Sequence, residues 1–415
     1  MIDAVYDTCV RCGLCLASCP TYLETMTETS GPRGRISLIK AVDEGRIDLL
    51  SPGFTAQMSE CLNCRACEAV CPSGVEYGRL VESARVAIEA EKAPKRTPAA
   101  AFTSWFLLRA LFSNLGLMRA VAVLTRFAQR SGLIDVASFL GLGQIAKLAP
   151  RIADRFFVAN GARYEAHDSA GLAFVHVGCV MSVAFPNVHE ATIRMLRRAR
   201  LSAIVPREQG CCGAIAAHAG DPEFARSLAK RNIEAFERSG AGVYVVNAAG
   251  CGSTLKEYGR LFENDRAWHE RAVAFSSRVR DIVEVLDAME LDSRIGRIDA
   301  RATYQEPCHL VHAQRISAAP RRLLARIPGL ELVEMNESSV CCGSAGIYNL
   351  TEPEMSRRLR DRKTRNIRET GTTYVATANP GCAMQVSAGL RDAGIGAQVK
   401  HIVELLDDAY AAFTP

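Results

Sequence analysis

Residues 9–20 read CVRCGLCLASCP and residues 61–72 read CLNCRACEAVCP, so one spacing of four cysteines and a proline occurs twice. This spacing is typical of bacterial two-cluster ferredoxins, in which the first three thiolates of each run hold one [4Fe-4S] cluster and the fourth ligates the other. The motifs predict two crossed ligand sets: Cys9, Cys12, Cys15 and Cys71 for cluster 1, and Cys61, Cys64, Cys67 and Cys19 for cluster 2. Structural zinc is the alternative, but zinc sites combine two ligand pairs and not a triplet with one distant cysteine.

The other eight of the 16 cysteines form two groups of four in the second half of the chain. Cys179 recurs as Cys308, Cys211-Cys212-Gly recurs as Cys341-Cys342-Gly, and Cys251 recurs as Cys382, each about 130 residues later. The similarity extends beyond cysteine, since Asp281-Ile-Val-Glu recurs as His401-Ile-Val-Glu. Two copies of one domain are the simplest explanation.

Short β-branched runs alternate with helical patterns inside each copy. The first copy shows LAFVHV (172–177), a helical pattern near 187–200, LSAIVP (201–206), a helical pattern near 222–238, and GVYVVNA (242–248). This alternation predicts parallel strands joined by crossover helices. Ligands of such sheets bind at the carboxyl ends of the strands, which is where the cysteines fall.

We therefore expect a chain of mixed α+β and α/β class. It should contain a helical two-cluster ferredoxin-like domain, a helical linker and two tandem α/β cysteine-rich repeats with parallel sheets. The predicted boundaries are 1–92 for the ferredoxin-type domain, 93–170 for an apolar and basic helical linker, 171–297 for the first repeat and 298–415 for the second.

Adjacent cysteines held at a glycine turn can present two thiolates to one metal centre, with two further thiolates closing the site. The candidate ligands of a third cluster are Cys179, Cys211, Cys212 and Cys251, and those of a fourth are Cys308, Cys341, Cys342 and Cys382. The alternative is that these are buried or redox-active thiols without metal. In that case the repeats would be metal-free docking modules.

The repeats resemble the CCG (cysteine-rich) domains of the heterodisulfide reductases. The last element of that domain carries a fifth cysteine that Cys251-Gly-Ser-Thr254 and Cys382-Ala-Met-Gln385 lack. The whole chain resembles the iron-sulfur subunits of glycolate oxidase (glycolate dehydrogenase). The stretches that carry this resemblance include GPRGRI (31–36), CPSGVEY (71–77), GCGSTLKEYG (250–259) and CCGSAGIYNLT (341–351). Subunits of anaerobic glycerol-3-phosphate dehydrogenase and of lactate-utilisation complexes share the general layout.

The glycolate oxidase resemblance implies an electron-transfer subunit of a membrane-associated oxidoreductase complex. FAD-containing partner subunits would oxidise glycolate or another 2-hydroxy acid, and this chain would relay the electrons toward a quinone or another acceptor. No catalytic residue for substrate oxidation is expected in this chain. The alternatives are a heterodisulfide-reductase-like subunit with catalytic CCG clusters, or the corresponding subunit of a glycerol-3-phosphate or lactate dehydrogenase complex.

Charge and hydropathy restrict partners and location. The 415 residues carry 50 basic and 45 acidic side chains, a net charge of +5, without the basic runs that nucleic-acid binding requires. The N-terminus lacks the pattern of a signal peptide, so a cytoplasmic location with reduced thiols is expected. Residues 102–127 are apolar but are interrupted by Arg109 and Arg119, which argues against a membrane span. This segment can lie on the inner face of the cell membrane or pack against protein.

Three further stretches carry weaker signals. Gly141-Leu-Gly143-Gln-Ile-Ala146 fits part of a dinucleotide fingerprint but follows no strand pattern, so nucleotide binding is not expected. His309 and His312 lie beside Cys308 and can donate to a cluster or be satisfied by backbone groups. Arg33 and Arg35 can offset cluster charge, contact a partner, or lie in a solvated turn.

Overall fold

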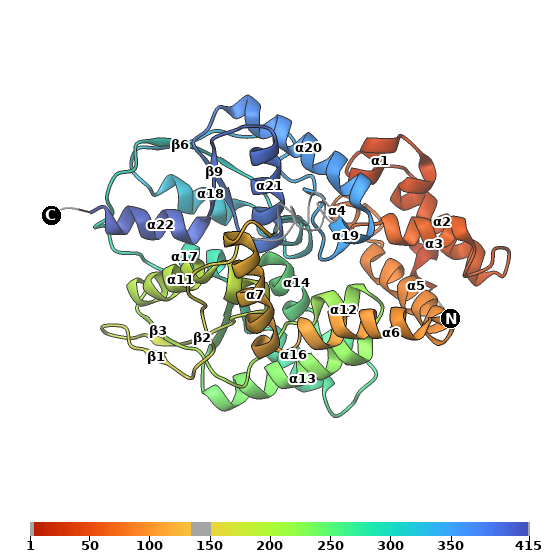
Figure 1. Cartoon of the computed structure of the whole chain (residues 1–415), viewed down its shortest axis with the longest axis horizontal. Coiled ribbons are helices and arrows are strands. Elements are labelled where there is room, and N and C mark those ends of the chain that lie inside the picture. The colour runs from red at the N-terminus through yellow and green to blue at the C-terminus, as the bar shows by residue number, and fades with distance from the viewer. Residues whose placement is uncertain (1–3, 134–150, 414–415) are drawn as a thin grey trace.

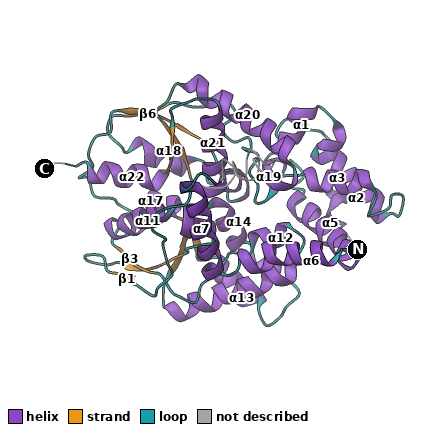
Figure 2. Cartoon of the chain, in the orientation of Figure 1, coloured by secondary structure: helices purple, strands orange, loops and turns teal. Residues whose placement is uncertain are grey.

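The computed structural model describes residues 4–133 and 151–413. The N-terminal helices, red and orange in Figure 1, gather at one end of the molecule, and the green and blue repeats form the other end. Helices outnumber strands throughout (Figure 2). Two mainly parallel sheets follow the helical N-terminal part, so the predicted mixed class is confirmed.

Prolines begin three helices of the N-terminal part, because the fixed φ of proline suits the first helical turn. One of them is Pro20, directly after Cys19. The helices of this part are η1 (Ala4–Thr8), α1 (Pro20–Thr25), η2 (Glu28–Ser30), α2 (Pro32–Asp43), α3 (Pro52–Glu60), α4 (Ala66–Ala69) and α5 (Tyr77–Lys92). A small core that includes Ile39, Phe54 and Leu80 joins α2, α3 and α5.

A bent helical segment connects this part to the first repeat. It comprises η3 (Ala93–Lys95), α6 (Pro98–Trp105), η4 (Phe106–Leu111) and α7 (Leu115–Arg130). The Asn114 side chain caps α7, and Met118 and Ala122 bury one face of that helix against the first repeat. The stretch from Gly141 to Ala146 lies outside the described residues.

The first repeat contains a five-stranded sheet in the order β1-β3-β2-β4-β5. Its strands are β1 (Arg163–Tyr164), β2 (Gly171–Val175), β3 (Leu201–Ile204), β4 (Val243–Val246) and β5 (Val279–Asp281). Its helices are α10 (Val180–Ala184), α11 (Pro186–Arg198), α12 (Ala214–His218), α13 (Pro222–Ser239), α14 (Ala249–Lys256), α15 (Tyr258–Leu261), α16 (His269–Ser276) and α17 (Ile282–Ala288). The pairings of β2 to β5 are parallel, whereas β1 adds an antiparallel edge from within residues 93–170.

The second repeat has a four-stranded, wholly parallel sheet in the order β7-β6-β8-β9. Its strands are β6 (Ala300–Tyr304), β7 (Leu330–Leu332), β8 (Tyr374–Thr377) and β9 (Gln398–His401). Its helices are η6 (His309–Ala313), α18 (Ala318–Ala325), α19 (Tyr348–Thr351), α20 (Pro353–Thr370), α21 (Pro380–Asp392) and α22 (Ile402–Ala411). The order β7-β6-β8-β9 repeats the order β3-β2-β4-β5, as expected of two copies of one domain.

The two repeats pack as one body. Helix α11 lies against α22, and Arg194 Nη2 pairs with Asp407 Oδ2 at 2.6 Å across this contact. Buried residues of both repeats, such as Leu196 and Leu406, belong to one core. The carboxyl ends of β4 and β8 also meet, where the Ala249 N–H donates to the Ala378 carbonyl at 3.0 Å. The cysteines after these two strands are therefore brought toward each other.

Candidate metal centres

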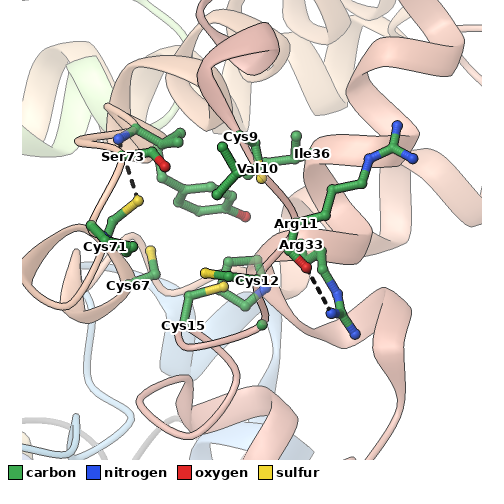
Figure 3. Close-up of a pocket in the computed structure, with 15 residues that line it drawn as sticks. Cys9, Val10, Arg11, Cys12, Cys15, Arg33, Ile36, Cys67, Cys71 and Ser73 are labelled. Atoms are coloured by element: carbon green, nitrogen blue, oxygen red, sulfur yellow. Dashed lines mark hydrogen bonds between the residues drawn. The ribbon is translucent and has the colours of Figure 1, made fainter.

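The crossed ligand set predicted for cluster 1 lines one pocket. Cys9, Cys12, Cys15 and Cys71 border about 430 Å³ of empty volume, part of it open to solvent, and Cys67 also reaches its wall (Figure 3). The first motif turns through Arg11 and Gly13, whose φ angles of 56° and 85° lie in the left-handed region. This turn brings cysteines from one short loop to a common space.

Protein donors already point at sulfur in this site. The Val75 N–H donates to Cys71 Sγ at 3.4 Å. The Arg33 guanidinium donates to the Arg11 carbonyl at 3.1 Å and pairs with Glu28. These two contacts of Arg33 fix the loop of the first motif on its solvent side. Burial raises the pKa of Cys15 to about 11. Such a thiol stays neutral until a metal displaces its proton, so cluster binding here would release protons.

The set predicted for cluster 2 is more deeply buried. Cys19, Cys61, Cys64 and Cys67 are all buried. The Asn63 N–H donates to Cys61 Sγ at 3.4 Å, and the Tyr77 hydroxyl donates to the same sulfur at 3.7 Å. Asn63 and Arg65 both have positive φ, so the second loop turns as the first does.

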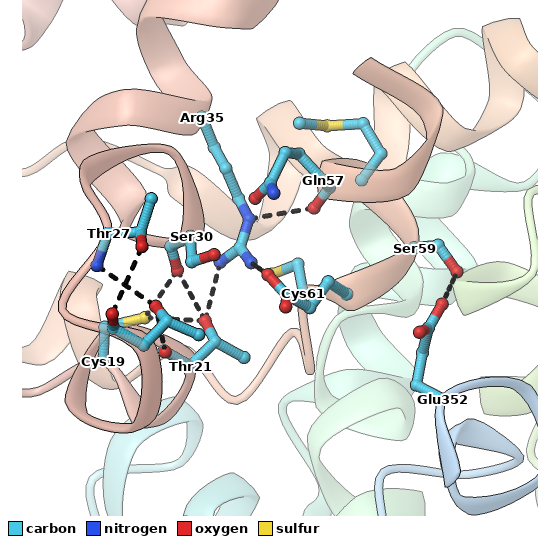
Figure 4. Close-up of polar contacts among 12 residues, drawn as sticks. Cys19, Thr21, Thr27, Ser30, Arg35, Gln57, Ser59, Cys61 and Glu352 are labelled. Atoms are coloured by element: carbon cyan, nitrogen blue, oxygen red, sulfur yellow. Dashed lines mark hydrogen bonds and ion pairs between the residues drawn. The ribbon is translucent and has the colours of Figure 1, made fainter. Parts of the chain in front are cut away.

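A buried arginine lies beside this second set (Figure 4). Only 1% of Arg35 is exposed, and its guanidinium donates to the Gln57 carbonyl at 2.9 Å, to Thr21 Oγ1 at 3.0 Å and to Glu60 at 2.9 Å. Burial alone would lower the pKa of Arg35, but the nearby tyrosine, thiols and carboxylate raise it, so the cation persists. Arg35 thus offsets the negative charge of thiolates, whereas Arg33 is half-buried at the rim.

The first repeat also brings its four predicted cysteines together. Cys179 and Cys211, Cys211 and Cys212, and Cys212 and Cys251 are close enough to shift each other's pKa. Gly213, at φ 85°, makes the turn after the adjacent pair, where a Cβ would approach the Ala225 carbonyl to 3.3 Å. Substitution of this glycine would therefore strain the turn that positions the pair.

His176 is a neighbour of Cys251 that no sequence motif identified. The interaction with Cys212 has the largest effect on the pKa of Cys251, and the contact with His176 acts in the same direction. Together they lower this pKa to about 6, although burial acts to raise it. His176 Nδ1 is oriented by the Tyr244 hydroxyl at 2.7 Å. Its position at the end of β2, three residues before Cys179, was the available signal, because ligands collect at strand ends.

The second repeat assembles the equivalent set. Cys308 Sγ lies 3.9 Å from Cys341 Sγ, and Cys341 and Cys382 are both close enough to Cys342 to lower its pKa. Lys363, only 2% exposed, lies close to this set and donates to the Glu337 and Ser338 carbonyls. Burial lowers the pKa of Lys363 while the cysteines act to raise it. This buried cation corresponds to Arg35 and was not predicted, since a lysine in a helix usually lies on its solvated face.

The two predicted histidines do not contact sulfur. His309 Nε2 donates to the Asn63 carbonyl at 3.0 Å, and His312 Nε2 donates to the Ser339 carbonyl at 3.1 Å. His312 is therefore satisfied by a backbone group, whereas in the described structure the buried His309 Nδ1 has no hydrogen-bond partner. The nitrogen that does contact a second-repeat sulfur is Asn379 Nδ2, 3.5 Å from Cys382 Sγ.

The chemistry of these sites suits iron-sulfur clusters. All 16 cysteines fall within the described residues and all are free thiols. Across residues 4–133 and 151–413, no three His, Cys, Asp or Glu side chains converge on a single-ion position. Sulfur donors, N–H groups aimed at sulfur and buried cations are what such clusters require.

The linker presents apolar side chains to solvent. Phe102, Trp105, Leu124 and Phe127 are 62%, 52%, 69% and 66% exposed. Among the described residues, none of the helices alone has the length and hydropathy needed to cross a membrane. The segments Pro98–Leu111 and Leu115–Arg130 meet the length and hydropathy of a span only when taken together, and a bend of 106° separates them. Arg126 donates to the Asp154 carbonyl at 2.7 Å, so part of the basic face of α7 binds this chain itself.

Comparison with known proteins agrees with this architecture. The profile of the 4Fe-4S dicluster domain matches residues 5–75, and the profile of the cysteine-rich domain matches 173–256 and 302–387. A probable glycolate oxidase iron-sulfur subunit of Bacillus subtilis (strain 168) is 38% identical over 97% of this chain and 93% of the relative. The glycolate oxidase iron-sulfur subunit of Escherichia coli (strain K12) is 33% identical, with 98% and 95% covered. Lactate utilization protein A of Exiguobacterium sp. (strain ATCC BAA-1283 / AT1b) is 30% identical over 56% of this chain and 95% of its own length.

Two ferredoxin-type motifs joined to two cysteine-rich repeats define an iron-sulfur subunit of an oxidoreductase complex. The two relatives at 38% and 33% identity, which match nearly the full length of this chain, are a probable glycolate oxidase iron-sulfur subunit and a glycolate oxidase iron-sulfur subunit. This similarity narrows the class to one family. The chain belongs to the family of glycolate oxidase iron-sulfur subunits, as its sequence motifs predicted.

Proposed function

We propose that this chain relays electrons in a membrane-associated glycolate (2-hydroxy-acid) dehydrogenase complex. A FAD-containing partner subunit removes two electrons from the substrate, and the cysteine centres of this chain pass them singly toward a quinone-type acceptor. Two [4Fe-4S] clusters in the ferredoxin half and one further cluster in each repeat would carry the electrons. Cluster potentials span about −700 to +450 mV, so the substrate and the acceptor determine the direction of flow.

The gradient of burial across the cysteine sets is the observation that supports a relay. Cys12 of the first set is exposed, Cys9, Cys15 and Cys71 are half-buried, and the second set is wholly buried. Electrons can therefore enter from a partner at the exposed set and continue inward. Thiolate clusters carry electrons but abstract neither the hydroxyl proton nor the hydride of a 2-hydroxy acid, so substrate oxidation falls to the flavoprotein.

Deletion of this chain tests the relay. In cells that keep the flavoprotein subunits, respiration-coupled glycolate oxidation should be lost, while glycolate oxidation with an artificial dye should remain in extracts. Unchanged respiration-coupled oxidation would contradict the proposal. Loss of both activities, with normal amounts of flavoprotein on immunoblots, would also contradict it, because a relay should leave the flavin site able to reduce dye.

The metal content can be measured directly. Anaerobically purified chain should contain about sixteen irons if each four-thiolate site holds a four-iron cluster. About eight irons would restrict the clusters to the ferredoxin half and favour metal-free repeats.

We place the chain in the cytoplasm with peripheral contact to the inner face of the cell membrane. Sixteen free thiols suit a reducing compartment, and the exposed side chains of α6 and α7 suit insertion at the level of lipid headgroups. Leu124→Gln with Phe127→Gln should reduce co-sedimentation with vesicles of anionic lipid, while iron content stays unchanged. Binding equal to that of wild type would remove this surface from the proposal.

A lactate-oxidising complex is the second candidate, since lactate utilization protein A matches this chain over 95% of its own length. Glycolate, L-lactate and glycerol 3-phosphate should be supplied separately to the intact complex. A preference for glycolate in kcat/KM supports the first assignment. A catalytic role of the repeats, as in a heterodisulfide reductase, predicts instead that the purified chain alone reduces a disulfide or a quinone when given a one-electron donor.

A further inference from the structure

The second cysteine motif lies against the second repeat. Cys64 shares a small buried apolar cluster with Cys341, and Cys308 packs against it. Of the nearby ionisable groups, Cys308 exerts the strongest electrostatic effect on Cys64. The buried cysteines of the first repeat, such as Cys212, belong to the large core, which in the described part of the chain includes no residue before Leu111. Within the described residues, the ferredoxin half therefore shares a buried cluster with cysteines of the second repeat and not with those of the first.

Backbone contacts fix this apposition. The Tyr348 hydroxyl donates to the Glu60 carbonyl at 2.9 Å, and His309 Nε2 donates to the Asn63 carbonyl at 3.0 Å. Glu60 and Asn63 lie on either side of Cys61, so the second repeat holds the ligand loop itself. The first repeat reaches the same loop through side chains, with His218 contacting Asn63 and Glu257 pairing with Arg65.

Asn379 connects the second repeat to the first. Its Nδ2 donates to Cys382 Sγ at 3.5 Å, and its Oδ1 accepts from the Gly250 N–H at 3.1 Å. Gly250 directly precedes Cys251. One side chain thus joins a sulfur of the second set to the backbone beside a sulfur of the first set, at the point where the two sheets meet.

Among the described residues, this bridge has no counterpart in the opposite direction: no side chain of the first repeat joins Cys251 to the backbone beside Cys382. When the two repeats are aligned on Cys251 and Cys382, the residue equivalent to Asn379 is Ala248. The nearby Asn247 turns its amide to His189 Nδ1 and Thr192 Oγ1 at 3.1 and 3.0 Å. This asymmetry indicates that the second repeat lies between the ferredoxin half and the first repeat on the path of the electrons. The two repeats are then not equivalent branches of that path.

We propose that electrons pass between the ferredoxin half and the first repeat only through the second repeat, with Asn379 as the positioning residue between the two repeats. In each step one electron leaves the site of Cys61, Cys64 and Cys67 and enters the site of Cys308, Cys341, Cys342 and Cys382, so that one is oxidised as the other is reduced. The same exchange then occurs with the site of Cys179, Cys211, Cys212 and Cys251. The electron source is a reduced flavin and the final acceptor a quinone, so this route rests on the proposed relay function.

The route is tested by electron paramagnetic resonance of the full-length chain, prepared anaerobically and poised at defined potentials. A paramagnetic neighbour accelerates the spin relaxation of the reduced cluster in the second motif. Cys342→Ser should abolish this acceleration, whereas Cys212→Ser, the matched change in the first repeat, should leave it intact. The reverse pattern, or no change in either variant, would overturn the route. Iron content of each variant shows whether only the intended centre was lost.

Asn379→Ala and the isosteric Asn379→Asp test the bridge. Both remove the amide donor to Cys382, so the midpoint potential of the second-repeat centre should become more negative, because its reduced form loses a stabilising hydrogen bond. Asn247→Ala is the matched control and should leave that potential unchanged. Unaltered potentials in both Asn379 variants at full iron content would overturn the role of Asn379. A wild-type chain with about eight irons would overturn the whole route while leaving a relay through the ferredoxin half in place.

Discussion

Asp281 and His401 occupy equivalent positions in the two repeats and cap equivalent helices with different chemistry. Asp281 Oδ1 accepts from the Val283 N–H at 3.0 Å, and His401 Nδ1 accepts from the Val403 N–H at 3.1 Å. Each helix also has a glutamate that returns a bond to the cap, Glu284 and Glu404. Burial raises the pKa of a carboxyl group and lowers the pKa of an imidazole. The contributions of Asp281 and His401 to the free energy of unfolding should therefore depend on pH in opposite directions.

The second repeat should lose stability in acid through His401. Burial lowers the pKa of His401 from 6.5 to about 4, so the unfolded chain binds a proton that the folded chain excludes. The stability present above about pH 6.5 is then lost as the pH falls toward 4, on the order of 3 kcal/mol. His401→Asn keeps a cap acceptor and should flatten the slope of unfolding free energy against pH between 7.5 and 5. An unchanged slope would contradict the prediction.

Asp281 should contribute the opposite trend in the first repeat. Burial raises the pKa of Asp281 from 3.8 to about 7, and its second carboxylate oxygen has no hydrogen-bond partner. The folded state therefore holds a proton that the unfolded state releases, and stability falls as the pH rises from about 4 to about 7. Asp281→Asn should remove this fall, measured as chemical-denaturation midpoints from pH 5 to 8. Asp292→Asn is the matched control: the hydrogen bond with Arg294 lowers the pKa of Asp292 to about 2, so this half-buried carboxylate does not titrate in that range.

Removal of Arg35 should destabilise the ferredoxin half and its second cluster. Arg35→Gln leaves Glu60, the Gln57 carbonyl and Thr21 without their buried cation, and breaking a buried pair costs about 3 to 5 kcal/mol. Arg33→Gln removes a solvent-accessible pair with Glu28, and this loss should matter far less because solvent screens the pair. Unfolding midpoints and iron content should both fall in the first variant only. Equal behaviour of the two variants would show that burial of the guanidinium does not matter.

The crossed ligand sets make a separate prediction. Cys71→Ser should remove the cluster of the first motif, because Cys71 lines that pocket, and Cys19→Ser should remove the cluster of the second motif. Redox titrations followed by electron paramagnetic resonance distinguish the two clusters. If each substitution removed the cluster of its own motif, the ligand sets would be uncrossed.

Much of the fold follows from local sequence pattern. The run LAFVHV forms β2, LSAIVP forms β3 and GVYVVNA forms β4, while the expected helix near 222–238 is α13. These elements are predictable because periodic burial and strong strand propensity act over a few neighbouring residues. The edge strand β1 was missed, since a two-residue strand carries no periodic signal and exists only through its pairing with β3.

The candidate sites also have a part that the sequence predicts and a part that only the fold reveals. Cysteine spacing identified every candidate ligand, because three thiolates in one short loop can reach one cluster only at that spacing. The neighbours Arg35, His176, Lys363 and Asn379 act across the fold. His176 and Asn379 each lie three residues before a cysteine, at a strand end, whereas Lys363 lies 21 residues after Cys342 and carries no such signal. The sequence marked Arg35 as a residue that can offset cluster charge. Its burial against Thr21 and Glu60 depends on how α2 packs against α3.

The sequence by itself determined which cysteines are the candidate ligands, that the second half is a duplication, and that the strands of each copy run parallel. Those properties depend on spacing and periodicity within short stretches of chain. The tertiary structure alone decided which cysteine set faces which repeat, and that Asn379 joins the two repeats from one side only. Such contacts arise when surfaces more than a hundred residues apart pack together, and no local pattern encodes which surfaces will meet.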